Sequence, residues 1–126
     1  MSIKIIPLDG FKKNYKKLAK KYKNIKEDIR KTVLELKENP KAGVKLKYNC
    51  YKIRVANSSV PIGKSGGFRI IYYFIDKKEN IYFMSIYSKK DQESISESEL
   101  LRILKLYDLD RYWFCMSNKN NLIKIL

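Results

Sequence analysis

The chain has 126 residues, enough for one domain, and its 44% hydrophobic content is ordinary for a globular protein. Lysine and arginine number 28 against 13 acidic residues, so the formal net charge is +15, which predicts a polyanionic partner such as nucleic acid. Two cysteines and no histidine exclude a disulfide framework and a zinc site. No apolar run approaches the roughly 18 residues of a membrane helix. We therefore expect a cytoplasmic protein with no membrane contact, metal or cofactor. An AT-rich genome, which favours lysine codons, is the alternative source of the charge.

The N-terminal part predicts a strand and a first helix. Ile3–Ile6 form a short apolar run ended by Pro7, and Asp9 is placed to cap the helix. The residues of the expected apolar face then follow at spacings of four, three and four, at Phe11, Tyr15, Leu18 and Tyr22. The remaining surface carries six lysines, Lys12, Lys13, Lys16, Lys17, Lys20 and Lys21. These could bind phosphates, although a solvated helix face is the simpler interpretation.

A second helix is expected directly afterwards. Asn24 and Glu27 have the spacing of a capping box, and the helix should end before Pro40. Its apolar stripe is formed by Ile25, Ile29, Val33 and Leu36. Because the link between the two helices is very short, they should form an antiparallel hairpin on one face of a sheet.

Three runs rich in β-branched and aromatic residues predict consecutive antiparallel strands at 51–55, 68–75 and 81–90. The loop 56–67 is rich in serine, glycine and proline, which predicts an exposed position. Both faces of the middle strand are apolar apart from Arg69, so this strand should be central. Burying a cation is costly unless it is paired. We therefore expect the sheet to present to an anion the basic residues Lys52, Arg54, Lys64, Arg69, Lys89 and Lys90.

The C-terminal part predicts a third helix and an irregular tail. Ser96 and Glu99 again have capping-box spacing, and an apolar stripe follows at Leu100, Leu101, Ile103, Leu104 and Tyr107. The nearby acids Asp91, Glu93, Glu97 and Glu99 are interpreted as residues of the first helical turn. We predict a domain at 1–107 and an extension of unknown role at 108–126, in which Leu122–Leu126 could form a strand.

A nucleotide-binding loop is not expected. Gly63-Lys64-Ser65 matches the end of a phosphate-binding P-loop, but the pattern needs a glycine where the chain has Ser58. It also needs a helix where the sequence predicts a strand.

The order strand, helix, helix, three strands, helix resembles the RelE/ParE toxin superfamily. Within it, the motif residues are similar to RelE/HigB-like toxins of bacterial toxin–antitoxin pairs in three stretches, Tyr51–Ala56, Gly63–Phe74 and Ile86–Lys89. The resemblance implies an α+β, RelE-like fold, β-α-α-β-β-β-α, with a mainly antiparallel sheet packed against a helical hairpin. It also implies an mRNA interferase that cuts mRNA in the ribosomal A site and is held inactive by a cognate antitoxin.

The resemblance also implies roles for individual residues. Arg69 matches the family's central-strand arginine and is assigned to the phosphate and to the charge of the transition state. Lys64 matches a basic position and is assigned as proton acceptor or phosphate clamp, and Lys89 matches the basic residue after the last strand. Tyr87 is expected to stack on a base, to donate a proton, or to lie in the core. The residues assigned to RNA binding are Lys52, Arg54 and Lys90.

The chain has no histidine, so a lysine or a tyrosine must handle the protons of metal-independent RNA cleavage. Two other functions are compatible with the same fold: a ParE-like poison of DNA gyrase, and an RNA-binding protein without catalysis. The basic residues of the sheet favour the nuclease.

Overall fold

The computed structural model describes residues 3–61, 66–75, 77 and 79–109. The chain divides into two compact units, Met1–Glu93 and Ser94–Leu126, which we describe separately. None of the helices in the described part of the chain is long and apolar enough to cross a bilayer.

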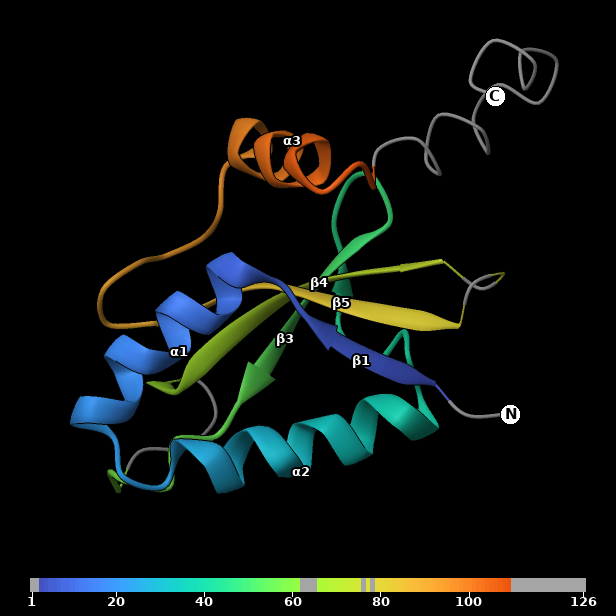
Figure 1. Cartoon of the computed structure of the whole chain (residues 1–126). Helices are drawn as coiled ribbons and strands as arrows, with labels where there is room; N and C mark the ends of the chain where they lie inside the picture. The colour runs from blue at the N-terminus through green and yellow to red at the C-terminus, as the bar shows by residue number, and fades with distance from the viewer. Residues whose placement is uncertain (1–2, 62–65, 76, 78, 110–126) are drawn as a thin grey trace, which may run out of the picture. The chain divides into compact units, whose positions relative to one another are not determined.

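The first unit is built on a five-stranded sheet in the order β1-β5-β4-β3-β2 (Figure 1). Its strands are β1 (Lys4–Pro7), β2 (Val44–Lys45), β3 (Cys50–Val55), β4 (Phe68–Ile75) and β5 (Asn80–Ser88). β3, β4 and β5 are consecutive antiparallel neighbours, whereas β1 runs parallel to β5. The expected mainly antiparallel sheet is confirmed. The sequence pattern missed β2, because two residues are too few to show any alternation.

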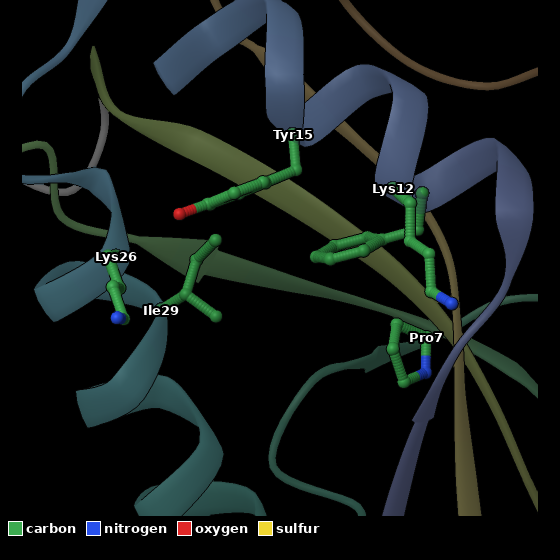
Figure 2. Close-up of a pocket in the computed structure, with 6 residues that line it drawn as sticks. Pro7, Lys12, Tyr15, Lys26 and Ile29 are labelled. Atoms are coloured by element: carbon green, nitrogen blue, oxygen red, sulfur yellow. The ribbon is translucent and has the colours of Figure 1, made fainter.

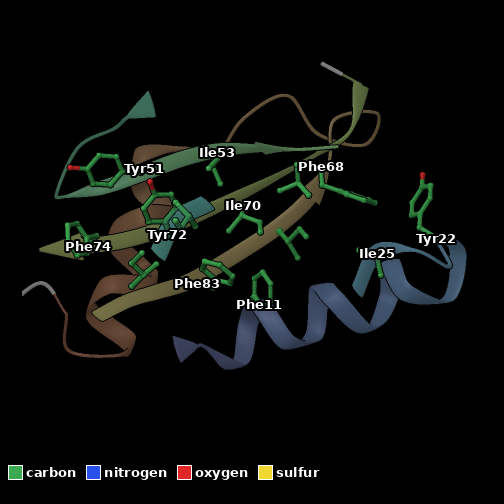
Figure 3. Close-up of a cluster of buried hydrophobic side chains, with 14 residues drawn as sticks. Phe11, Tyr22, Ile25, Tyr51, Ile53, Phe68, Ile70, Tyr72, Phe74 and Phe83 are labelled. Atoms are coloured by element: carbon green, nitrogen blue, oxygen red, sulfur yellow. The ribbon is translucent and has the colours of Figure 1, made fainter. Parts of the chain in front are cut away.

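Two helices, α1 (Asp9–Lys21) and α2 (Ile25–Glu38), cover one face of this sheet. Figure 3 shows Phe11 of α1 directed at the strands, where its ring lies 5.1 Å from that of Phe83. All eight residues of β4 are buried, which confirms the prediction that this strand is central. Its core-facing residues are Phe68, Ile70, Tyr72 and Phe74. Arg69 therefore faces the opposite side of the sheet.

The expected helix caps are wrong in two of three cases. Leu8 is the N-cap of α1, so Asp9 lies inside the first turn. Asn24 is the N-cap of α2, but its side chain makes no capping bond and its side-chain amide donates to the Ser58 carbonyl at 3.4 Å. The backbone amide of Asn24 donates to Ser59 Oγ at 3.0 Å and not to Glu27, which pairs with Arg30. The box also fails because the chain entering α2 is tied to the loop that follows β3.

The first residues of the loop after β3 are held in place, although the composition of the loop predicted an exposed position. The buried carboxylate of Asp28, on α2, accepts a hydrogen bond from the Ser58 amide at 3.0 Å, and Asn57 is buried as well. Residues 62–65, which include Lys64, lie outside the described residues. Where the chain returns, a Cβ on Gly67 would collide with the carbonyl oxygen of Val55. Only glycine allows β4 to begin this close to the end of β3.

The second unit contains α3 (Glu97–Leu106). Ser96 Oγ accepts a hydrogen bond from the Glu99 amide at 3.1 Å, so this predicted cap is confirmed. The buried residues Leu100, Ile103 and Leu104 confirm the predicted stripe. Residues 110–126 lie outside the described residues, and the strand at Leu122–Leu126 and the boundary at Tyr107 stay predictions.

Candidate functional site

The strand register brings three of the predicted site residues into one row. Arg54 of β3 lies opposite Arg69 of β4, and Arg69 lies opposite Tyr87 of β5. Because side chains alternate along a strand, all three lie on the face away from α1 and α2, together with Lys52. We call Lys52, Arg54, Arg69 and Lys89 the cationic cluster.

A β-bulge puts Tyr87 on this face. Ile81 and Phe83 of β5 belong to the core, so simple alternation would also direct Tyr87 into the core. The register shifts at Ile71/Tyr72, and beyond this point Ile86 faces the core and Tyr87 lies beside Arg69. Bulges often redirect a side chain next to functional sites.

Asn14 of α1 stabilises the bulged segment. Its Oδ1 accepts hydrogen bonds from Ser85 Oγ at 3.1 Å and from the Ile86 amide at 3.4 Å. A bulge disrupts the regular ladder locally, so a side-chain acceptor here supplies a partner for its backbone.

Arg69 is the most buried cation of the cluster, with 5% of its surface exposed. Its Nη1 donates to the carbonyl oxygen of Phe68 at 3.1 Å. Burial lowers the pKa of this guanidinium, and the positive charge of Arg54 lowers it further. Like charges at facing strand positions destabilise a sheet. An anion bound between the two guanidinium groups would offset that repulsion.

Lys89 follows β5 and is held close to the start of β4. Its amide donates to the Gly67 carbonyl oxygen at 3.0 Å. Its ammonium Nζ lies 2.9 Å from Glu93 Oε2. The turn between them is closed by the amides of Asp91 and Gln92, which both donate to the Ser88 carbonyl.

Glu93 is a site residue that sequence reasoning missed. It precedes α3 and is no first-turn acid, so that interpretation was wrong, whereas Glu97 and Glu99 do lie in the first turn. The hydrogen bond from Lys89 is the main cause that lowers the pKa of Glu93, and the positive charges of Lys89, Lys52 and Arg69 add to it. The four-residue spacing from Lys89 was the available signal.

Tyr87 has a hydroxyl that lacks a hydrogen-bond partner among the described residues, although the residue is only 6% exposed. Burial raises the pKa of this phenol, and the charge of Arg69 partly opposes the rise. The phenol therefore remains protonated and available as a donor. An unsatisfied buried polar group is costly, and it is often found where a ligand completes the site.

The remaining predicted site residues are less well placed. Lys90 is exposed in the turn after β5, and nothing in the described part of the chain joins its side chain to the cluster. The position of Lys64 is not described. No group of histidine, cysteine, aspartate and glutamate among the described residues could hold a metal ion.

A pocket of about 260 Å³ lies on the helical side of the sheet and not at the cationic cluster. Figure 2 shows Lys12 and Tyr15 of α1 facing Lys26 and Ile29 of α2 across it, with Pro7 at one end. Its lining is mainly apolar, in contrast to the charged face around Arg69.

Comparisons with known proteins agree with this fold. The family described as "ParE toxin of type II toxin-antitoxin system, parDE" matches residues 5–93. A free double mutant of E. coli toxin RelE is 25% identical with a TM-score of 0.53, covering 74% of this chain and 90% of its own. RelE in the intact E. coli RelBE toxin–antitoxin complex is 25% identical with a TM-score of 0.50, covering 67% and 93%. The isolated RelE toxin, at 21% identity and a TM-score of 0.51 over 82% and 98% of the two chains, shares the fold. The family match spans more than half of the chain, so this protein belongs to the RelE/ParE superfamily and is a toxin of the type II toxin–antitoxin class.

Proposed function

We propose that this toxin is a metal-independent, ribosome-dependent mRNA endonuclease that acts at the ribosomal A site. The observation that carries the proposal is the row of Arg54, Arg69 and Tyr87, in which two arginines at facing strand positions adjoin a buried hydroxyl that has no hydrogen-bond partner among the described residues. Neighbouring positive charges and an unsatisfied hydroxyl lower the stability of the free protein, but they could bind a phosphate group. Activity on ribosomes would place the protein in the cytoplasm.

The chemistry is attack of a ribose 2′-hydroxyl on the adjacent phosphorus. The new O–P bond forms as the bond to the 5′ oxygen breaks, which leaves a 2′,3′-cyclic phosphate and a 5′-hydroxyl. Arg69 is positioned to stabilise the negative charge that develops on the phosphate oxygens. Lys52, Arg54 and Lys90 would hold the neighbouring phosphates, and the ammonium of Lys89 would add positive charge beside the reacting phosphate. Lys64 would accept the proton of the 2′-hydroxyl or clamp the phosphate.

Tyr87 is the best candidate for the proton donor. Its hydroxyl is buried beside Arg69 and remains protonated because burial raises its pKa. A leaving 5′ alkoxide is far more basic than a phenolate, so proton transfer to it remains downhill despite that raised pKa. Stacking of Tyr87 on a base is less compatible with its burial.

A cognate antitoxin is the expected protein partner, since a solved relative is RelE in complex with its antitoxin. An acidic or amphipathic segment that covers the cationic cluster would neutralise the toxin. Its gene should lie beside that of the toxin, and co-expression should restore growth.

Replacement of Arg69 by alanine tests the proposal. Loss of one charge contact in the transition state costs on the order of 3 kcal/mol, so cleavage should fall roughly a hundredfold or more. The measurement is the appearance of new mRNA 5′ ends inside reading frames after induction. Arg30→Ala, which removes an exposed arginine of α2, is the matched control. Full toxicity of a folded Arg69→Ala protein would exclude the assigned role.

The main alternative is a ParE-like poison of DNA gyrase, which the family match favours by its description. Such a toxin would inhibit supercoiling by purified gyrase and create no new mRNA ends. An RNA-binding protein without catalysis would do neither. The same induction experiment, combined with a supercoiling assay, separates the three functions.

A further inference from the structure

The lysines of α1 form a second cationic surface that the proposed chemistry does not use. All six are exposed: Lys12, Lys13, Lys16, Lys17, Lys20 and Lys21. We call them the α1 lysine face. The helix contains one acidic residue, Asp9, so it has a net charge of +5. Because α1 covers the opposite side of the sheet from Arg69, the two cationic surfaces are separate.

The charge of α1 is not shared by the other helices. α2 has four basic and four acidic residues, and α3 has two of each, so both are neutral. A codon bias towards lysine would act on every helix. The contrast therefore shows that the surplus on α1 is local and not a consequence of overall composition.

The arrangement of these lysines is unfavourable for the helix itself. None of the six forms an ion pair with any described residue, whereas Arg30 and Arg102 pair with acids three residues earlier on their own helices. Four pairs of lysines in α1 stand at i,i+4 positions, and each such like-charge pair costs about 0.2–0.5 kcal/mol. A bound polyanion would turn this repulsion into attraction.

The residue types indicate the kind of polyanion. Lysines four residues apart are separated by about 6 Å along the helix axis, which gives a regular row of charges for a regular row of phosphates. Arginine is preferred where base edges are bound in a fixed geometry, and α1 contains none. The α1 lysine face therefore suits binding to a phosphate backbone and not recognition of a particular base sequence.

Other partners fit less well. Binding to single strands uses exposed aromatic rings, but Phe11 is in the core and Tyr15 lines the pocket. Membrane-binding helices insert their apolar face, which in α1 is packed on the sheet. Protein interfaces are poor in lysine and rely on large apolar anchors, and the exposed ones among the described residues, Leu34, Val44 and Leu106, lie outside α1.

We propose that the α1 lysine face binds the phosphate backbone of double-helical nucleic acid, with structured RNA as the physiological form. The choice of RNA rests on the proposed function, since a toxin that acts on translating mRNA meets RNA duplexes at its target. The cationic cluster would hold the strand to be cut while α1 holds a duplex on the opposite side. The protein would thus be clamped between two RNA elements.

The test compares two triple variants with the same loss of charge. Lys16→Gln, Lys17→Gln and Lys20→Gln are combined on α1, and Lys26→Gln, Lys31→Gln and Lys37→Gln are combined on α2. Glutamine is a good helix former, so both proteins should fold, which circular dichroism verifies. Binding of a blunt-ended RNA duplex is measured by fluorescence anisotropy over a salt series. The α1 variant should weaken binding and reduce the salt slope by roughly one for each lysine, and the α2 variant should change neither.

Equal effects of the two variants would overturn the proposal, because net charge alone would then explain binding. The proposal would also be overturned if the α1 variant bound the RNA duplex normally but lost binding to another polyanion. The polyanions to compare are a DNA duplex of the same sequence, phosphatidylserine vesicles and polyglutamate. An Arg69→Ala protein should still bind the RNA duplex. If mRNA cleavage is never detected but duplex binding depends on the α1 lysine face, the proposed function fails and this inference stands.

Discussion

Two buried tyrosines make opposite predictions for the same chemical change. The hydroxyl of Tyr87 has no hydrogen-bond partner among the described residues. The hydroxyl of Tyr72 donates to the Pro40 carbonyl at 2.7 Å and accepts from the Gly43 amide at 3.1 Å. Replacing each by phenylalanine removes one oxygen atom and leaves the ring in place. If Tyr87 serves the reaction and Tyr72 the fold, their effects on stability must differ in sign.

The magnitudes follow from hydrogen bonding. A buried hydroxyl without a partner costs about 1–3 kcal/mol, so Tyr87→Phe should raise the free energy of unfolding by up to that amount. Tyr72→Phe leaves an amide and a carbonyl without their partner, and should lower it by about 1–3 kcal/mol. Each kcal/mol moves the melting temperature by roughly 2–8 °C in a chain of this size. Urea unfolding of the three proteins measures the difference.

The effects of the two substitutions on activity should be the reverse of their effects on stability. Loss of a general acid lowers a rate by roughly 10²–10⁴-fold, so the stabilised Tyr87→Phe protein should be the less toxic one. Tyr72→Phe should cleave mRNA normally at temperatures where it is folded. A Tyr87→Phe protein that is both more stable and fully toxic would show that the phenol plays no part in the reaction. A less stable one would show that the hydroxyl is satisfied in the fold.

Three further predictions concern the site and its support. Glu93→Gln should tighten RNA binding and steepen its salt dependence, because it releases Lys89 from its ion pair; cleavage lost with binding intact would instead identify Glu93 as a proton carrier. Gly67→Ala should destabilise the protein and lower its yield, because a Cβ there meets the backbone of Val55, and thermal unfolding measures the loss. Burial raises the pKa of Tyr72 from 10.0 to about 12, so the unfolded chain loses this proton first and stability should fall between pH 10 and pH 12. The fall should be smaller in Tyr72→Phe, as urea titrations across that range would reveal.

The architecture could be predicted from the sequence because its signals are periodic. The hairpin stripes of α1 and α2 and the doubly apolar β4 each extend over eight or more residues, and the structure confirms them. The caps could not be predicted as well. Asn24 and Glu27 have the spacing of a capping box, but the backbone amide of Asn24 donates to Ser59, 35 residues away, and not to Glu27. Local patterns do not contain such tertiary contacts.

The sequence was sufficient to predict which cations belong to the site, but not how the site residues are arranged. The sequence predicted that the sheet presents Arg54 and Arg69 to an anion, and the strand register shows that the two residues lie opposite each other. The position of Tyr87 on the cationic face depends on a β-bulge, and nothing in the apolar sequence of β5 indicates where a bulge occurs. Glu93 was overlooked because its proximity to Lys52 and Arg69 arises from the fold, although its spacing from Lys89 was visible.

The positive charges of this protein fall into two groups that obey different rules. On α2 and α3, arginines pair with acids of the same helix, as expected where only stability is at stake. Arg69 faces Arg54 across the sheet, and the lysines of α1 repeat at like-charge spacings. Both arrangements lower stability in the isolated chain. Glu93 offsets part of the repulsion at the sheet, whereas no described residue forms an ion pair with the lysines of α1. A polyanion that contacts both surfaces would offset the repulsion that remains at each. On this reasoning, neutralising Arg54 or a lysine of α1 should stabilise the free toxin and weaken its binding to RNA, whereas breaking the Arg30–Glu27 pair should leave RNA binding unchanged.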